Sequence, residues 1–271
     1  MEAHLKKLPI GRAAWSCAAL ALLTVPALAQ DADELAKAVA NPLANMISVP
    51  LQGNVDFGQG ANNDGQDYSL KIQPVIPFAL NKDWNVISRT ILPISFAHNI
   101  FPNDVGGLGD LTQSFFLSPS GKNPYGITWG IGPEFLIPTA TDRDLGGGKW
   151  GVGPTGLVLL QQDKWTVGML ASQTWSVAGD SSRSDISELF LQPFVSYSLG
   201  EGQTLGANME ASYDWNASQW SVPINFTYSK VFTAGTQPMS FSIGVRKYLV
   251  TADGGPDWGL RGGLTFLFPE K

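Results

Sequence analysis

The sequence predicts an all-β fold: a transmembrane antiparallel β-barrel of about twelve strands, preceded by a short N-terminal helix. Two observations lead to this fold class, a low content of charge and a repeated alternation of apolar and polar residues. Charged residues make up only 15% of the chain, whereas about 25% is usual in soluble proteins. The mean hydropathy is +0.01, and no stretch after residue 30 is apolar for long enough to form a membrane-spanning helix.

The alternation is clearest between residues 204 and 215. Odd positions there are apolar, from Leu205 to Trp215, and even positions are polar or small, from Thr204 to Asp214. Successive side chains of a strand point to opposite faces, so one face suits lipid and the other suits a lumen. The same pattern predicts strands at 47–57, 68–80, 84–96, 109–118, 126–137, 150–161, 165–176, 186–199, 204–215, 220–231, 239–249 and 258–268.

Tryptophan placement separates a membrane barrel from a soluble β-sandwich, which would also show alternation. A sandwich would bury its tryptophans in one core, whereas a barrel places them in girdles at the headgroup level. Eight tryptophans fall on the apolar faces, and most of them lie near a strand end. The eight are Trp84, Trp129, Trp150, Trp165, Trp175, Trp215, Trp220 and Trp258. This placement favours the barrel.

The connections between the predicted strands alternate in length. Residues 81–83, 162–164 and 200–203 are tight turns, whereas 58–67, 97–107, 138–149, 177–185 and 250–257 are longer and rich in Gly, Asp and Asn. Barrels have short turns on the periplasmic side and longer loops outside. We therefore expect the N-terminus in the periplasm. The connections at 119–125 and 232–238 are longer than expected for periplasmic turns, and 216–219 is short for an external loop.

An export signal occupies residues 1–29. A basic segment precedes the apolar run Ala13–Val25, and Ala27-Leu28-Ala29 predicts cleavage before Gln30. An uncleaved anchor is disfavoured because the apolar run is short. The only cysteine, Cys17, lies inside this signal, so the mature chain has no disulfide, thiolate metal site or cysteine nucleophile.

Residues 30–46 form a predicted N-terminal segment, and residues 47–271 form the barrel. A helix is expected over Asp33–Ala40, with Asn41-Pro42 ending it. This helix either lies against the periplasmic mouth or plugs the lumen, and the first interpretation is preferred.

The charges of the mature chain give a formal net charge of −8, because the signal holds three of the 17 basic and one of the 23 acidic residues. Nucleic-acid binding needs a basic surface, so a nucleic-acid partner is not expected. The expected partners are outer-membrane lipid and a small-molecule solute.

Ten charged residues point into the lumen by strand parity: Asp56, Lys71, Arg89, Asp110, Glu134, Glu188, Glu210, Asp214, Arg246 and Arg261. They either brace a narrow lumen or line a path that selects solutes by charge. Six acids against four bases predict a mild preference for cations. Parity also predicts that Met209→Arg, facing lipid, destabilises by about 2–4 kcal/mol and that Glu210→Gln is much milder.

Small and apolar side chains share this inward face. Gly130, Gly132, Gly151, Gly153 and Gly168 make room for a pore, for the N-terminal helix or for bends in the wall. Several inward positions are large and apolar, which a wholly aqueous porin would not need: Phe116, Leu136, Phe190, Phe194, Tyr248 and Leu267. An aromatic or weakly polar solute fits such a lining.

Signs of catalysis are weak, and no catalytic residue, metal ligand or cofactor is expected. The mature chain has one histidine, His98, and Ser95 lies nearby on the opposite face. A serine hydrolase needs the two groups in contact. No His or Cys cluster has the spacing of a metal site.

Several stretches resemble a known family of Gram-negative outer-membrane proteins. They include Asn41–Pro50, Gln73–Pro77, Trp84–Pro93, Gly107–Asp110, Pro138–Thr141, Gly148–Pro154 and Tyr213–Pro223. These stretches are similar to barrels grouped with the phenol-degradation meta-pathway family, which are labelled as transporters. The resemblance covers nearly the whole mature chain and implies a barrel, an outer-membrane location and, less directly, transport.

The function expected from these observations is that of an outer-membrane channel or transporter for a small solute, without enzymatic activity. The alternatives are a lipase- or deacylase-type enzyme in the same membrane and a closed barrel without a pore.

Overall fold

The computed structural model describes residues 25–121 and 123–269. Its helices are α1 (Val25–Val39) and the short 3-10 helix η1 (Arg143–Leu145). Its strands are β1 (Met46–Gln59), β2 (Gly65–Ile72), β3 (Val75–Ala79), β4 (Trp84–His98), β5 (Val105–Leu108), β6 (Leu111–Pro119), β7 (Ile127–Ile137), β8 (Lys149–Gln162), β9 (Trp165–Gly179), β10 (Ser187–Gly200), β11 (Gln203–Met209), β12 (Ala211–Asp214), β13 (Gln219–Ala234), β14 (Gln237–Val250) and β15 (Trp258–Pro269).

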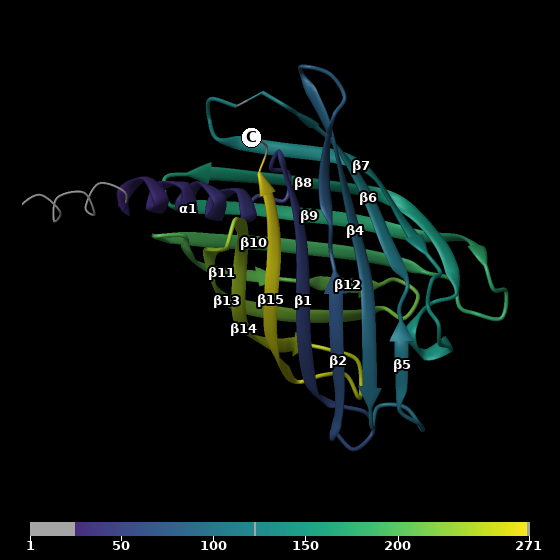
Figure 1. The fold of residues 1–271 in the computed structure, drawn as a ribbon. Coiled ribbons are helices and arrows are strands. Elements are labelled where there is room, and N and C mark those ends of the chain that lie inside the picture. The colour runs from purple at the N-terminus through teal and green to yellow at the C-terminus, as the bar shows by residue number, and fades with distance from the viewer. Residues whose placement is uncertain (1–24, 122, 270–271) are drawn as a thin grey trace, which may run out of the picture.

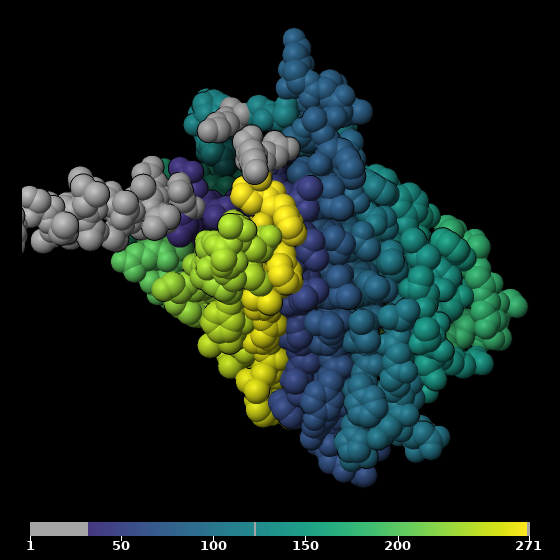
Figure 2. Space-filling view, in the orientation of Figure 1, coloured from purple at the N-terminus to yellow at the C-terminus, as the bar shows by residue number. Residues whose placement is uncertain are grey.

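These segments form one closed antiparallel barrel of twelve strands, as the sequence predicts (Figure 1). Each strand pairs with the next along the chain, and β1 closes the ring by pairing with β15 from Met46–Pro269 to Phe57–Trp258. Figure 2 shows this seam, where the C-terminal strand lies directly beside the first one. Closure removes sheet edges, so every strand has two partners inside the membrane.

Two predicted strands are each interrupted once: β2 is separated from β3 at Gln73-Pro74, and β11 from β12 at Glu210. The short strand β5 lies mainly in the segment predicted as a loop at 97–107, and Gly109-Asp110 separates it from β6. Pro74 has no N–H to donate to the sheet. The N–H of Glu210 still donates to Pro223 O at 3.0 Å, so this strand bends without leaving the wall.

The two ends of the barrel differ in their connections. At the short-turn end, β13 and β14 are joined through residues 235–236, where Gly235 has a φ of 64°. This turn is shorter than the connection predicted at 232–238, because both strands extend beyond their predicted ends. The helix α1 and the end of β15 lie at this same end (Figure 1). The opposite, long-loop end carries the connections predicted to be external.

The outer face of the wall is apolar. Seven of the eight tryptophans assigned to it are exposed, from Trp220 and Trp129 at 37% to Trp165 and Trp215 at 52%. Between them the same face exposes Val158, Phe226 and many other large apolar side chains. Such a continuous surface is stable only against lipid. No helix among the described residues is long and apolar enough to span a membrane.

The helix α1 begins at Val25 and not at Asp33, the start predicted from its capping residues. Residues 1–24 of the predicted signal lie outside the described residues. Ala36 packs with Met46, Val231 and Leu267 at the short-turn end. The N–H of Gly202, in the turn between β10 and β11, donates to Asp33 Oδ1 at 2.7 Å. The helix therefore lies against the mouth of the barrel, tied to a turn.

The segment after the helix enters the lumen. Leu43 is 6% exposed and packs against Ile87, Phe116, Leu157, Leu159 and Leu170. Gly130 makes room for it: a Cβ there would lie 3.2 Å from a methyl carbon of Leu43. The helix itself thus lies at the mouth, and the residue that enters the lumen is Leu43, which follows the helix.

Candidate functional site

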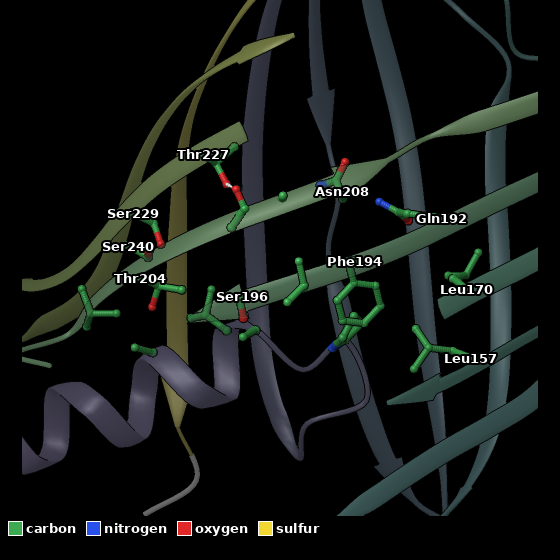
Figure 3. A pocket seen from close by; sticks show the side chains of 18 of the residues that line it. Leu157, Leu170, Gln192, Phe194, Ser196, Thr204, Asn208, Thr227, Ser229 and Ser240 are labelled. Atoms are coloured by element: carbon green, nitrogen blue, oxygen red, sulfur yellow. Dashed lines mark hydrogen bonds between the residues drawn. The ribbon is translucent and has the colours of Figure 1, made fainter. Parts of the chain in front are cut away.

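Three of the cavities in the described part of the lumen follow one another along the barrel. The inner cavity, about 280 Å³, lies beside α1 and Pro42. The outer cavity, about 340 Å³, lies between β2, β4 and β10. The mouth cavity, about 530 Å³, lies among the loops of the long-loop end, next to Arg143 and Arg183. Figure 3 shows the inner cavity with Phe194 and Asn208 pointing into it above the helix.

Neighbouring cavities share lining residues. Arg89, Leu170 and Gln192 line both the inner and the outer cavity. Leu170 and Gln192 are paired across β9 and β10, while Arg89 comes from β4. We call these three residues the neck. Asp110, Leu136, Ile186 and Glu188 connect the outer cavity to the mouth cavity in the same way.

An ion cluster fills the part of the lumen next to β1, β14 and β15. Arg261 donates to both carboxylate oxygens of Glu210 at 2.8 and 3.0 Å, and its Nε donates to Asn54 at 2.8 Å. Arg246 donates to Asp56 at 3.0 Å and lies 3.6 Å from Glu210. The two arginine side chains are only 4% and 6% exposed. Four of the ten predicted lumen charges are thus brought together in one bracing network.

The other predicted acids bind neutral groups. Asp110 accepts from the N–H of Ala140 at 3.1 Å and of Gly147 at 2.7 Å, which ties the loop 138–148 to the wall. Glu134 is buried and accepts from Ser114 at 2.8 Å and Thr174 at 3.3 Å.

Asp214 and Glu188 lie nearer the long-loop end. Asp214 caps its turn by accepting from the N–H groups of Asn216 and Ala217. Glu188 is exposed to the outer and mouth cavities and has the Ser212 hydroxyl as its hydrogen-bond partner.

The two remaining predicted cations, Lys71 and Arg89, line the outer cavity without a close acid. Among the residues that the structure describes, neither has a carboxylate oxygen within 4.0 Å. Sequence reasoning missed Arg143 and Arg183, which the loops bring to the mouth cavity. Strand parity gives no information on loop side chains, so nothing in the alternating pattern could have found them.

The glycines and aromatic residues predicted on the inward face shape the cavities. A Cβ on Gly168 would lie 2.5 Å from the ring of Phe194, so this glycine makes room for a side chain that lines the inner cavity. Phe190 lines the outer cavity beside Leu136. Phe116 and Leu267 are buried in the two apolar clusters near the short-turn end.

The family is identified by residues 52–271, which match the one described as "Putative MetA-pathway of phenol degradation". The chain belongs to this phenol-degradation family. The match spans nearly the whole barrel, including every strand that lines the three cavities, and confirms the family expected from the sequence.

Solved structures share the fold of this family member. An outer membrane channel from Pseudomonas putida F1 is 16% identical, with a TM-score of 0.66, over 83% of this chain and 96% of its own. The NanC porin is 12% identical, with a TM-score of 0.51, over 80% of this chain and 98% of its own. The search of curated proteins gave no match. The chain thus has the fold of outer-membrane β-barrels, which agrees with the outer-membrane location predicted from the sequence.

His98 of this family member lies at the end of β4, on the rim of the long-loop end. Its Nδ1 lies 2.8 Å from Asp104 Oδ2, and this hydrogen bond holds the pKa of the Asp104 carboxyl below its ordinary value. No serine hydroxyl among the described residues hydrogen-bonds to His98. In the same described part, no group of three or more His, Cys, Asp or Glu residues could hold a metal ion.

Proposed function

We propose that the protein is a channel or transporter that carries a small, aromatic or weakly polar solute across the outer membrane. The observation that supports this most directly is the row of three cavities linked by shared residues from the long-loop end to α1. A barrel serving only as a structural element would fill its lumen with side chains. The P. putida protein of the same fold is described as an outer membrane channel, which agrees with the proposal.

The lining indicates the class of solute. The outer cavity combines apolar side chains, such as Ile91, Leu136 and Phe190, with glutamines and charged groups. The neck presents Leu170 beside Gln192 and Arg89. A solute with an apolar body and one or two polar groups satisfies both kinds of surface.

Conductance and solute flux test the proposal. The purified mature protein should give discrete current steps in planar bilayers and should accelerate the swelling of liposomes in a small aromatic solute compared with protein-free liposomes. An absence of both would favour the closed barrel. Release of fatty acid from phospholipid by the same preparation, lost in His98→Ala, would favour the enzyme instead.

A further inference from the structure

The acids and the cations that line the outer cavity differ in how much hydrogen-bonding capacity they retain. Glu210 is bound by two arginines, Asp110 by two backbone N–H groups, and Glu134 by two hydroxyls. Only Glu188 lacks two donors, since Ser212 is its one partner. The acids of this cavity therefore have little capacity left for a solute.

The cations of the same cavity remain available. Neither the Lys71 ammonium nor the Arg89 guanidinium makes a side-chain hydrogen bond or a close ion pair with another described residue. Both side chains are half-buried, so they face the cavity and not bulk water. Arg89 also lines the inner cavity, which places it where a solute must pass from one chamber to the next.

Two more arginines line the mouth cavity, together with the acids Asp110, Asp185, Glu188 and Asp214. These arginines are Arg143 and Arg183, and no carboxylate oxygen of a described residue lies within 4.0 Å of either guanidinium. The nearby Asp185 is bound by Lys149 at 3.1 Å. Arg183 donates to Gly146 O and Gly147 O. The cations of the three cavities without a side-chain hydrogen bond to another described residue are thus Arg143 at the mouth, Lys71 in the outer cavity and Arg89 at the neck.

Apolar side chains surround these donors. Leu136, Leu170 and Phe190 line the outer cavity with Lys71 and Arg89, and the cavity volume of about 340 Å³ suits a small molecule. Typical small-molecule sites have volumes of about 300–1,000 Å³ and place a few polar groups in a largely apolar wall. A guanidinium matches the planar, two-oxygen geometry of a carboxylate better than that of any neutral group.

We propose that the outer cavity binds small organic acids, with the carboxylate on Lys71 and Arg89 and the apolar body against Leu136, Leu170 and Phe190. The inference rests on the proposed channel function and specifies its solute as a weakly hydrophobic carboxylate. The inference differs from the mild cation preference that the count of inward charges predicts. That count includes charges that are already paired, whereas a solute binds to groups that still have free donors.

Binding to the purified full-length mature protein in detergent tests this, with benzoate as the probe and benzamide as its neutral analogue. Titration calorimetry should show benzoate binding at least about tenfold more tightly than benzamide, the loss expected when a charge-assisted hydrogen bond is removed. Arg89→Gln and Lys71→Gln should each weaken benzoate binding by about tenfold and leave benzamide unchanged. Lys230→Gln, which removes an equal charge from the outer face, is the matched control.

Glu188→Gln should change the affinity for benzoate in the opposite direction to Arg89→Gln and Lys71→Gln. This variant removes the least-bound carboxylate facing the cavity, so it should tighten benzoate binding without affecting benzamide. Because it should strengthen binding, a damaged fold cannot imitate the expected result. Equal affinity for benzoate and benzamide, or an effect of Lys230→Gln equal to that of Arg89→Gln, would overturn the inference.

Conductance distinguishes this inference from the proposed function. Current steps without selective benzoate binding leave the channel standing and remove the carboxylate site. Selective benzoate binding in a barrel that passes neither ions nor benzoate supports the site and removes the channel.

Discussion

At the scale of single residues, Glu210 shows that an inward charge can stabilise the barrel through ion pairs with neighbouring side chains. Its carboxylate receives two bonds from Arg261 and lies near Arg246, and all three side chains are largely buried. Buried beside them, Asp56 Oδ1 and Arg246 Nε have no partner among the described residues. Removing another partner from this network should lower the stability of the barrel strongly, because each uncompensated buried charge costs several kcal/mol of folding free energy.

We therefore expect Glu210→Gln to lower the free energy of unfolding by about 3–5 kcal/mol, since it leaves Arg261 and Arg246 without a full counter-charge. This reverses the mild effect expected from the sequence. Denaturant unfolding in lipid vesicles measures it. Met209→Arg, on the lipid face of the same wall, should cost about 2–4 kcal/mol. Glu201→Gln, in an exposed turn, is the control, and a cost for Glu210→Gln no greater than that of Glu201→Gln would contradict the bracing role.

At the scale of elements, the N-terminal segment joins the wall in two different ways. The helix α1 is held at the mouth by the apolar packing of Ala36 and by polar contacts, including the bond from Gln161 Nε2 to Lys37 O at 2.9 Å. The following residues place Leu43 in an apolar cluster between β4, β7 and β8. A single side chain thus couples the helix to the interior of the barrel.

Leu43→Ala should widen the inner part of the path and raise the single-channel conductance. It should also lower stability by about 2–5 kcal/mol, because the cluster loses a buried leucine. Current recording and denaturant unfolding measure the two effects. Ile47→Ala, which truncates a lipid-facing side chain in β1, should leave conductance unchanged. If Leu43→Ala destabilises the barrel and its conductance equals that of the wild type, Leu43 only packs and does not restrict the path.

At the scale of the whole molecule, the apolar wall agrees with the export signal predicted at residues 1–29. An apolar outer face closed by the pairing of β1 with β15 is insoluble outside a bilayer. The chain must therefore leave the cytoplasm before its lipid face forms, and export is the step that the predicted signal would serve.

The mature protein should begin at Gln30 and fractionate with the outer membrane. N-terminal sequencing of the protein purified from that fraction measures the cleavage site. Ala29→Arg, which removes the small residue before the site, should block processing, whereas Ala32→Ser should not. Retention of residues 1–29 in the wild-type protein would contradict the cleavage prediction and leave the barrel assignment unaffected.

The sequence by itself determined the wall of this protein. Strand periodicity is local, because each side chain alternates with its neighbour, so the twelve strands and the lipid-facing tryptophans followed from reading along the chain. The sign of a charge and the face on which it lies followed in the same way, as for Lys71 and Arg89.

Only the tertiary structure decided which inward charges meet. Arg246 and Asp56 are far apart in the sequence and become partners because closure and strand stagger bring β14 beside β15 and β1. Parity fixes a direction but not a depth, so it could not separate the paired Arg261 from the unpaired Arg89. The loop residues Arg143 and Arg183 and the insertion of Leu43 follow no period at all, since their positions depend on contacts made only after the barrel has closed.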